Sequence, residues 1–131
     1  GHEENLRALR SEALRAMRLL ERFSPRLVGP VLAGTATPHS DVSLHLFAEA
    51  PEQVAFLLLE RGIRYQEGER RLRLTHGEHA FYPSFAFDLG GAAVEVVVFP
   101  ERALRQPPVC PVSGGPMRRA RRDEIERLLD D

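Results

Sequence analysis

Residues 27–46, with the sequence LVGPVLAGTATPHSDVSLHL, constrain the fold more than any other part of the chain. An apolar stretch that begins at Leu27 is followed by two glycines and then by a two-residue alternation. Successive side chains of an extended chain point to opposite faces. Residues 41–47 therefore divide into an apolar face and a polar face, with Val42, Leu44 and Leu46 on the first and Asp41, Ser43 and His45 on the second. This segment predicts an apolar strand start, a glycine-containing turn and a second strand with one buried face.

The regions on either side of this segment predict two helices. Residues 3–23 carry apolar side chains at helical spacing, and Pro25 is expected to end that helix because the residue before a proline avoids the helical conformation. A second helix is expected from Pro51 to Arg61, with Gly62 at the position of a left-handed C-cap.

Four later segments favour strands, namely residues 63–65, 71–75, 81–88 and 94–99. Glu67-Gly68 is expected to form a hairpin turn between the first two, and Gly90-Gly91 a turn between the last two. Pro83 indicates an edge position or a late start for the third strand, because proline donates no ladder hydrogen bond.

Residues 100–117 have no periodicity and predict an ordered surface loop, after which residues 118–129 predict a terminal helix. A chain of 131 residues suits one domain, residues 1–131. The order of elements is helix, two strands, helix, a run of strands and a final helix. This order favours an α+β domain with a mixed sheet that helices cover on one face.

Residues 27–46 resemble the signature of the polymerase-β-like nucleotidyltransferases, which runs apolar-Gly-Ser, a short Arg-Gly segment, then Ser-Asp-apolar-Asp-Leu. Gly29, Gly34, the run from Thr37 to Asp41, and Leu44 are in step with it. The resemblance implies a nucleotidyltransferase-like fold for the whole domain. It also implies a nucleotide-binding cleft, to which Gly29, Gly34, Ser40 and Ser43 would contribute.

The same resemblance implies where metal-binding carboxylates would lie. Nucleotidyl transfer depends on two divalent ions that carboxylates hold against the triphosphate and the attacking oxygen. Asp41 matches the first of these carboxylates, and Glu95, inside the apolar strand AVEVVVF, matches the third. Ser43 takes the second place and brings no charge. If the chain is active, Mg²⁺ is the expected cofactor, with Asp41 and Glu95 as its ligands.

Three departures from the signature point to a loss of the transfer reaction. Pro30 replaces the serine after the first glycine and has neither an N–H nor a hydroxyl, so it removes two phosphate donors. Ala33 replaces an arginine, and Ser43 replaces an aspartate. We therefore expect a non-catalytic nucleotide-binding or regulatory module. The alternatives are an active metal-dependent nucleotidyltransferase with an unknown acceptor, and a protein-interaction domain that uses its arginine-rich helices.

Other reactive side chains follow no familiar pattern. His39, His45, His76 and His79 do not have the spacing of a zinc site, and Cys110 is a lone cysteine for which we expect a structural or incidental role. The run of arginines in residues 118–122 suggests either a phosphate or RNA contact or a solvated face. At the start of a helix this run opposes the helix dipole, which favours acidic residues there.

Charge and composition limit the classes of partner. The formal net charge of −1 argues against a general nucleic-acid footprint, and no apolar run approaches the roughly 20 residues of a membrane helix. A single cysteine fits a reducing compartment. We expect a cytoplasmic protein that binds a nucleotide or an unknown protein partner, with no membrane association.

Overall fold

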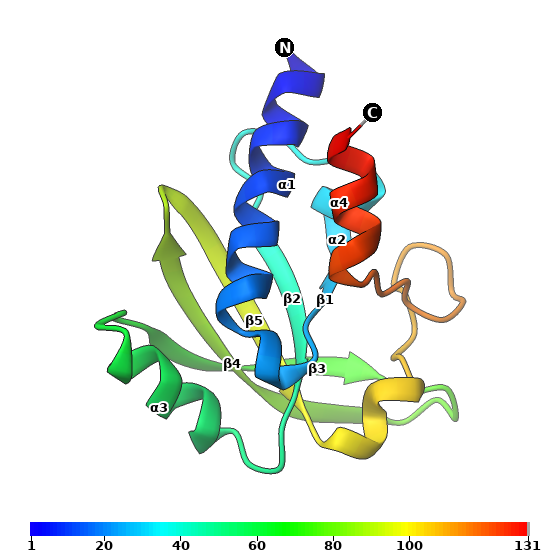
Figure 1. The fold of residues 1–131 in the computed structure, drawn as a ribbon. Helices are drawn as coiled ribbons and strands as arrows, with labels where there is room; N and C mark the ends of the chain where they lie inside the picture. The colour runs from blue at the N-terminus through cyan, green and yellow to red at the C-terminus, as the bar shows by residue number, and fades with distance from the viewer. Residues whose placement is uncertain (131) are drawn as a thin grey trace.

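The computed structural model describes residues 1–130, which fold into four α-helices and a five-stranded mixed sheet. The strand order is β1 (Arg26–Val28), β2 (Val42–Phe47), β5 (Ala92–Phe99), β4 (His79–Leu89) and β3 (Gln66–Arg73) (Figure 1). β2 and β5 are parallel, and every other neighbouring pair is antiparallel.

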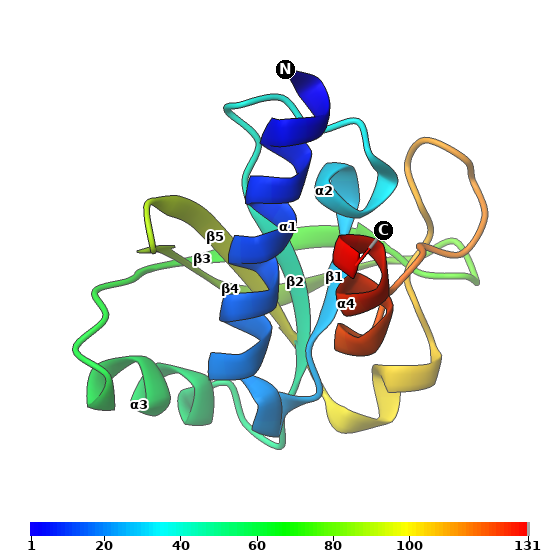
Figure 2. The same ribbon diagram turned by 45° about the horizontal axis from the view of Figure 1, so that its top comes forward.

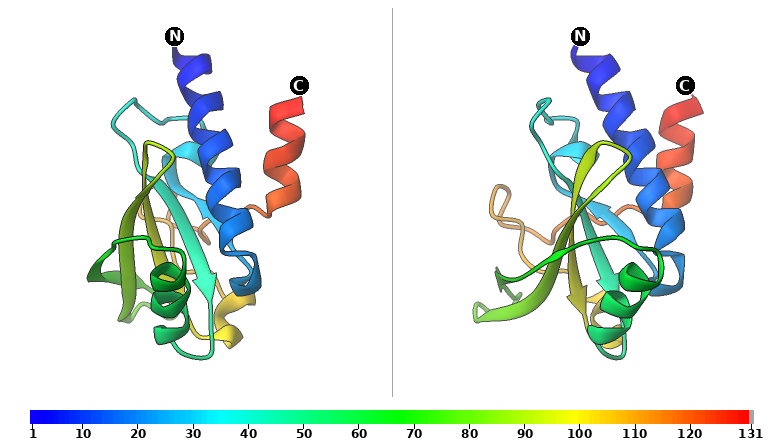
Figure 3. Two further views of the ribbon diagram at one scale, coloured as in Figure 1. Left: turned by 60° about the vertical axis from the view of Figure 1, so that its left-hand side comes forward. Right: turned by 90° about the vertical axis from the view of Figure 1, so that its left-hand side faces the viewer.

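Helices cover one face of this sheet. α1 (His2–Leu19) crosses the sheet, and α4 (Arg122–Asp130) packs beside it, as Figure 2 shows. α3 (Glu52–Glu60) lies on the same side, whereas the chain between the 3₁₀ helix η2 (Glu101–Arg105) and α4 passes over the opposite side (Figure 3). The predicted α+β class, with a mixed sheet and helices on one face, is confirmed.

The main core lies between the sheet and α1. Val42, Leu44 and Leu46 of β2 are completely buried on the helix-covered face, as their alternation predicted. They pack in one cluster with Ala13 and Met17 of α1. Burying apolar surface on this scale is the dominant favourable term in folding, so the alternation of β2 determines which face of the sheet α1 covers.

A second, smaller core lies on the opposite face of the sheet. Phe47 of β2, Val97 and Phe99 of β5, and Ala103 of η2 form it, and Tyr82 packs against it. The rings of Phe47 and Phe99 are stacked with their centroids 5.7 Å apart. Both faces of the two central strands are therefore apolar at this end of the sheet.

The hairpin predicted at Glu67-Gly68 is wrong. β3 runs without interruption through both residues, and the chain turns at residues 74–78, where Gly77 has a φ of +94°. Gly68 lies inside this strand, where a Cβ would approach Ser84 Oγ of β4 to 3.0 Å. A glycine here serves close strand packing and not a turn.

Pro83 occupies an edge position within β4. It pairs with Glu69 of β3, whereas β4 pairs with β5 only from Ser84 onwards. The side of Pro83 that faces away from β3 thus has no strand beside it. Pro83 therefore lies inside β4, at the point where the strand gains its second neighbour.

Two segments near the ends of the sheet differ from expectation. Residues 29–33, expected as part of an apolar extended segment and turn, form the short helix α2 (Gly29–Ala33). The terminal helix begins at Arg122 and not at residue 118, and Asp123 and Glu124 occupy its first turn, as the helix dipole favours. Residues 118–121 are extended, and Ala120 forms an antiparallel bridge with Leu27 of β1.

Within residues 1–130, none of the helices is both long enough and apolar enough to cross a lipid bilayer.

The packing of α3 can be tested with two neighbouring leucines. Leu58 is fully buried, whereas Leu59 is 61% exposed. We predict that Leu58→Ala lowers the free energy of unfolding by about 2–5 kcal/mol, because it leaves a cavity in the main core. Leu59→Ala is the matched control and should change it by less than about 0.5 kcal/mol. Denaturant unfolding of the two variants measures both values, and equal effects would contradict the packing described here.

Candidate functional site

A cavity of about 490 Å³ opens on the face of the sheet opposite α1, and we call it the cleft. Its walls come from α2 and the end of β1, from the outward-facing side chains of β2, β5 and β3, and from residues 110–113 of the long loop. Most of the lining is aliphatic, including Val28, Leu72, Val97, Val112 and Met117.

Gly29 lets the chain enter α2 directly against β2. Its φ is +77°, a left-handed conformation that favours glycine, and a Cβ there would lie 3.6 Å from Ser43 Cβ. Pro30 follows in the first turn of α2 and also lines the cleft. Because proline lacks an N–H, the start of α2 offers one backbone donor fewer to a ligand than the resemblance implies.

Ser43 and Glu95 meet in the cleft. They are direct partners in the parallel pairing of β2 and β5, and both line the cavity. The carboxylate of Glu95 lies 3.4 Å from the guanidinium of Arg70 on β3, which also lines the cleft. The centre of the cleft thus has a hydroxyl beside an ion pair, and Thr35, Ser113 and Arg118 add further polar groups to the lining.

The remaining site residues predicted from the sequence lie elsewhere. Ser40 and Asp41 line a second hollow of about 580 Å³, which lies between α1 and the turn that joins β4 to β5. Ser40 Oγ accepts a hydrogen bond from the Thr37 backbone N–H at 2.9 Å, which closes a local turn. Gly34 has a φ of +86° and caps the end of α2, and it lines neither cavity. The structure thus brings Gly29, Ser43 and Glu95 together and leaves Gly34, Ser40 and Asp41 outside the cleft.

The donor set of the cleft does not fit a pair of divalent ions. Glu95 is the one carboxylate that lines it, and Arg70 already neutralises this charge. Across residues 1–130, no three His, Cys, Asp or Glu side chains are grouped so that they could hold a metal ion. Mg²⁺ prefers a near-octahedral set of oxygen ligands, which one paired carboxylate and one hydroxyl do not provide.

His45 lines the cleft and forms a polar pair with the half-buried Arg119. His45 is only 3% exposed, and its Nδ1 accepts a hydrogen bond from Arg119 Nε at 3.0 Å. Arg119 Nη1 donates to the backbone carbonyl of Ala103 at 2.9 Å. The Arg119 guanidinium lies within cation–π distance of both stacked rings, 4.8 Å from the centroid of Phe47 and 4.9 Å from that of Phe99.

Burial and neighbouring charge keep this histidine neutral. Burial first, and then the positive charges of Arg119 and Arg70, together lower the pKa of His45 to about 3. Burial, and then the charge of Arg26, lower the pKa of Arg119 to about 10, so the arginine stays protonated at neutral pH. A neutral imidazole that accepts at Nδ1 carries its proton on Nε2. The pair therefore supports the floor of the cleft and does not act as an acid or a base near pH 7.

Sequence reasoning missed this pair. His45 was expected on the polar face of its strand, and that face is covered by the aromatic core instead. Arg119 was expected inside a helix among other arginines. Nothing in the local sequence separates Arg119 from its neighbours, because its partners come from β2, β5 and η2.

The other singled-out side chains are scattered. His39 lines the second hollow, and His76 Nδ1 accepts a hydrogen bond from the Glu78 backbone N–H at 3.3 Å in the β3–β4 turn. Cys110 lines the cleft, where hydrogen bonds from the backbone and the hydroxyl of Ser113 lower the pKa of its thiol.

In comparisons with known proteins, no family model, curated protein or solved structure matches the chain.

The buried neutral histidine predicts a specific pH dependence of stability. The pKa of His45 is about 3 in the folded protein and about 6.5 in the unfolded chain, so acidification protonates the unfolded chain first. Its contribution to stability is complete above pH 6.5 and falls by about 1.4 kcal/mol per pH unit between pH 6.5 and pH 3.

His45→Asn tests this dependence because asparagine keeps an acceptor near the Nδ1 position without a titrating group. Between pH 7 and pH 5 the wild-type protein should lose about 2 kcal/mol more unfolding free energy than the variant. Urea unfolding at the two pH values gives this difference. Parallel pH profiles for the two proteins would show that His45 does not remain neutral on folding.

Proposed function

We propose that this chain is a non-catalytic binding module with a nucleotidyltransferase-like fold, and that the cleft binds a nucleoside or nucleotide without transferring it. Two observations support the fold assignment. The signature-like segment 27–46 forms the strand, short helix and strand around the cleft. Ser43 and Glu95, which match two of the carboxylate positions of the family, lie opposite each other on neighbouring strands.

The size and the lining of the cleft suit a heterocycle with a polar edge. Ligand pockets commonly enclose about 300–1,000 Å³ and combine apolar walls with a few polar groups that orient the ligand. Here the aliphatic walls can pack against the faces of a base. Ser43, Arg70 and Glu95 provide a hydroxyl, a cation and a carboxylate for its edge.

The ion pair between Arg70 and Glu95 is the observation that carries the non-catalytic part of the proposal. Nucleotidyl transfer depends on positioning and on stabilising the charge that develops on the transferred phosphoryl group. The carboxylate that would hold a metal ion is here paired with an arginine, and Asp41 lines the second hollow. Pro30 and Ala33 further reduce the number of groups that could contact phosphates. The cleft still has the apolar walls and the few polar groups that ligand binding requires.

Ligand binding can be tested by thermal shift and calorimetry with nucleosides and nucleoside triphosphates, with and without Mg²⁺ or Mn²⁺. We predict stabilisation that does not depend on the metal. Glu95→Gln should weaken binding about tenfold or more, because a hydrogen bond to a charged group contributes about 1.5–3 kcal/mol.

Asp41→Asn is the control for this experiment, because it removes a carboxylate that lies outside the cleft, and it should leave the affinity unchanged. Binding that requires Mg²⁺ and is lost in Asp41→Asn would overturn the proposal. It would favour the active nucleotidyltransferase instead.

The absence of catalysis has its own test. We predict no transfer of label from a radiolabelled nucleoside triphosphate to protein, RNA or a small acceptor. Ser43→Asp should increase the affinity for Mn²⁺, because it places a second carboxylate opposite Glu95, and Ser43→Asn is the uncharged control of similar size. Equal Mn²⁺ affinities for the two variants would argue that the cleft does not descend from a metal site. Label transfer that Asp41→Asn abolishes would refute the non-catalytic assignment.

A further inference from the structure

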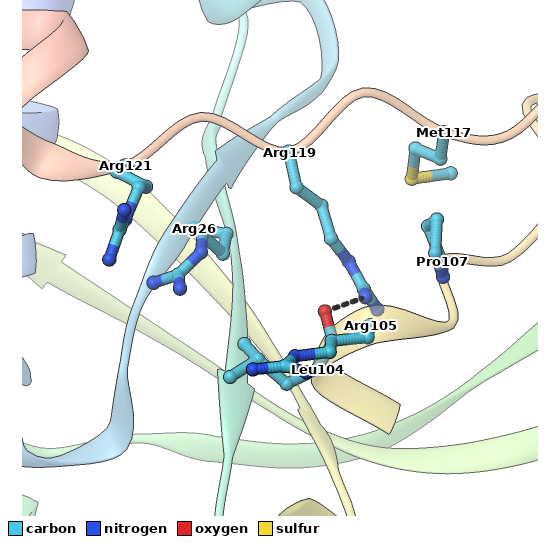
Figure 4. Close-up of a pocket in the computed structure, with 7 residues that line it drawn as sticks. All are labelled: Arg26, Leu104, Arg105, Pro107, Met117, Arg119 and Arg121. Atoms are coloured by element: carbon cyan, nitrogen blue, oxygen red, sulfur yellow. Dashed lines mark hydrogen bonds between the residues drawn. The ribbon is translucent and has the colours of Figure 1, made fainter. Parts of the chain in front are cut away.

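A separate cavity of about 490 Å³ is lined by four arginines that come from three parts of the chain. Arg26 belongs to β1, Arg105 to η2, and Arg119 and Arg121 to the extended segment before α4 (Figure 4). We call this space the arginine cavity. Its lining includes no acidic side chain.

The backbone holds two of these arginines side by side. Leu27 and Ala120 exchange both of their hydrogen bonds, from Leu27 N–H at 2.8 Å and from Ala120 N–H at 2.9 Å. In this antiparallel register Arg26 lies opposite Arg121, on the face away from the buried Leu27 and Ala120 side chains. Like charges that lie directly opposite on paired strands destabilise a sheet. The fold thus retains a repulsive pair that a different side chain at either position would remove.

No carboxylate of residues 1–130 forms an ion pair with any of the four arginines. Arg26 donates to the backbone carbonyls of Ser24 and Pro25, and Arg119 donates to those of Ala103 and Leu104. Carbonyl oxygens satisfy N–H groups but carry no charge. Arg119 Nη2, although buried, has no partner within the described chain.

Burial and the crowding of positive charge lower the pKa of two of these arginines. Burial lowers the pKa of Arg26, and the charge of Arg121 lowers it further, with a smaller opposing effect from Asp123. Arg26 in turn lowers the pKa of Arg119. The four groups still carry a positive charge at neutral pH, since an arginine is protonated well above pH 7.

We propose that the arginine cavity binds the phosphate group of a small phosphorylated molecule. Guanidinium groups bind phosphate oxygens through two parallel N–H···O contacts, which makes arginine the preferred residue for this anion. An anion in the cavity would relieve the repulsion between Arg26 and Arg121. Leu104, Pro107 and Met117 provide an apolar wall for the organic part of the ligand.

This inference goes beyond the proposed function and does not rest on it. The cleft and the arginine cavity share Met117 and no other lining residue. Arg105 and Arg121 line the arginine cavity and not the cleft, so variants at these two positions test the arginine cavity separately from the cleft.

The experiment is a calorimetric titration of the protein with inorganic pyrophosphate and with phenyl phosphate at constant ionic strength. We expect saturable binding of one anion per chain. Arg105→Gln should weaken it about tenfold or more, because it removes one charged donor. Arg102→Gln is the matched control, since Arg102 lies in the same 3₁₀ helix but does not line the cavity, and it should leave the affinity unchanged.

Arg121→Gln provides a second variant that does not disturb the aromatic core, and it should also weaken binding about tenfold. The proposal is wrong if neither probe binds, or if Arg102→Gln and Arg105→Gln weaken binding equally, which would indicate diffuse charge attraction. It is also wrong if a single-stranded oligonucleotide binds far more tightly than both probes, because the partner would then be a nucleic acid.

Discussion

The parallel pairing of β2 with β5 is the interaction on which the rest of the structure depends. One register places Ser43 beside Glu95 at one end of the two strands and Phe47 beside Phe99 at the other. The first pair contributes the polar groups of the cleft, and the second forms the aromatic core that holds Arg119. A shift of this register by one residue would reverse every side chain of β2 and would destroy both sites and the main core at once.

Arg119 connects the aromatic core to the cleft. Its guanidinium packs against the stacked rings of Phe47 and Phe99, and its Nε donates to His45, which lines the cleft. The same side chain also lines the arginine cavity. This half-buried side chain is held in one orientation by two rings and by several hydrogen bonds. The positions of the floor of one cavity and the wall of the other are consequently fixed by a single side chain.

How far the sequence predicts this structure depends on whether the relevant contacts are local. The alternation of residues 42–46 predicted the buried face of β2, and Gly62, which has a φ of +69°, lies at the predicted helix end, because both signals arise within a few residues. The hairpin at Gly68 was misplaced because this glycine lies in close contact with Ser84 of another strand, which the local sequence does not show. The arginine run before α4 was predicted as helix because its extended conformation depends on a bridge to Leu27.

The candidate site shows the same division. Strand parity predicted that Ser43 faces away from the main core, and the resemblance singled out Glu95 as its neighbour. In the structure the two residues are paired across β2 and β5. Asp41 was expected to join them. It lies just before the first residue of β2, outside the strand pairing, and it lines the second hollow instead. The pairing of Glu95 with Arg70 and that of His45 with Arg119 join strands and segments far apart in the sequence. No local pattern could have indicated either one.

The bridge between Leu27 and Ala120 also affects the order in which the molecule can be completed. β1 pairs with β2 along one side, and its other side is occupied by a segment that lies far along the chain. Closing so long a loop is entropically unfavourable until the intervening strands have assembled, so this contact is expected to form late. Until then the outer side of β1 is an open strand edge, of the kind that recruits other chains into aggregates. Arg26 lies on that edge, and a charged side chain there disfavours pairing with another strand edge.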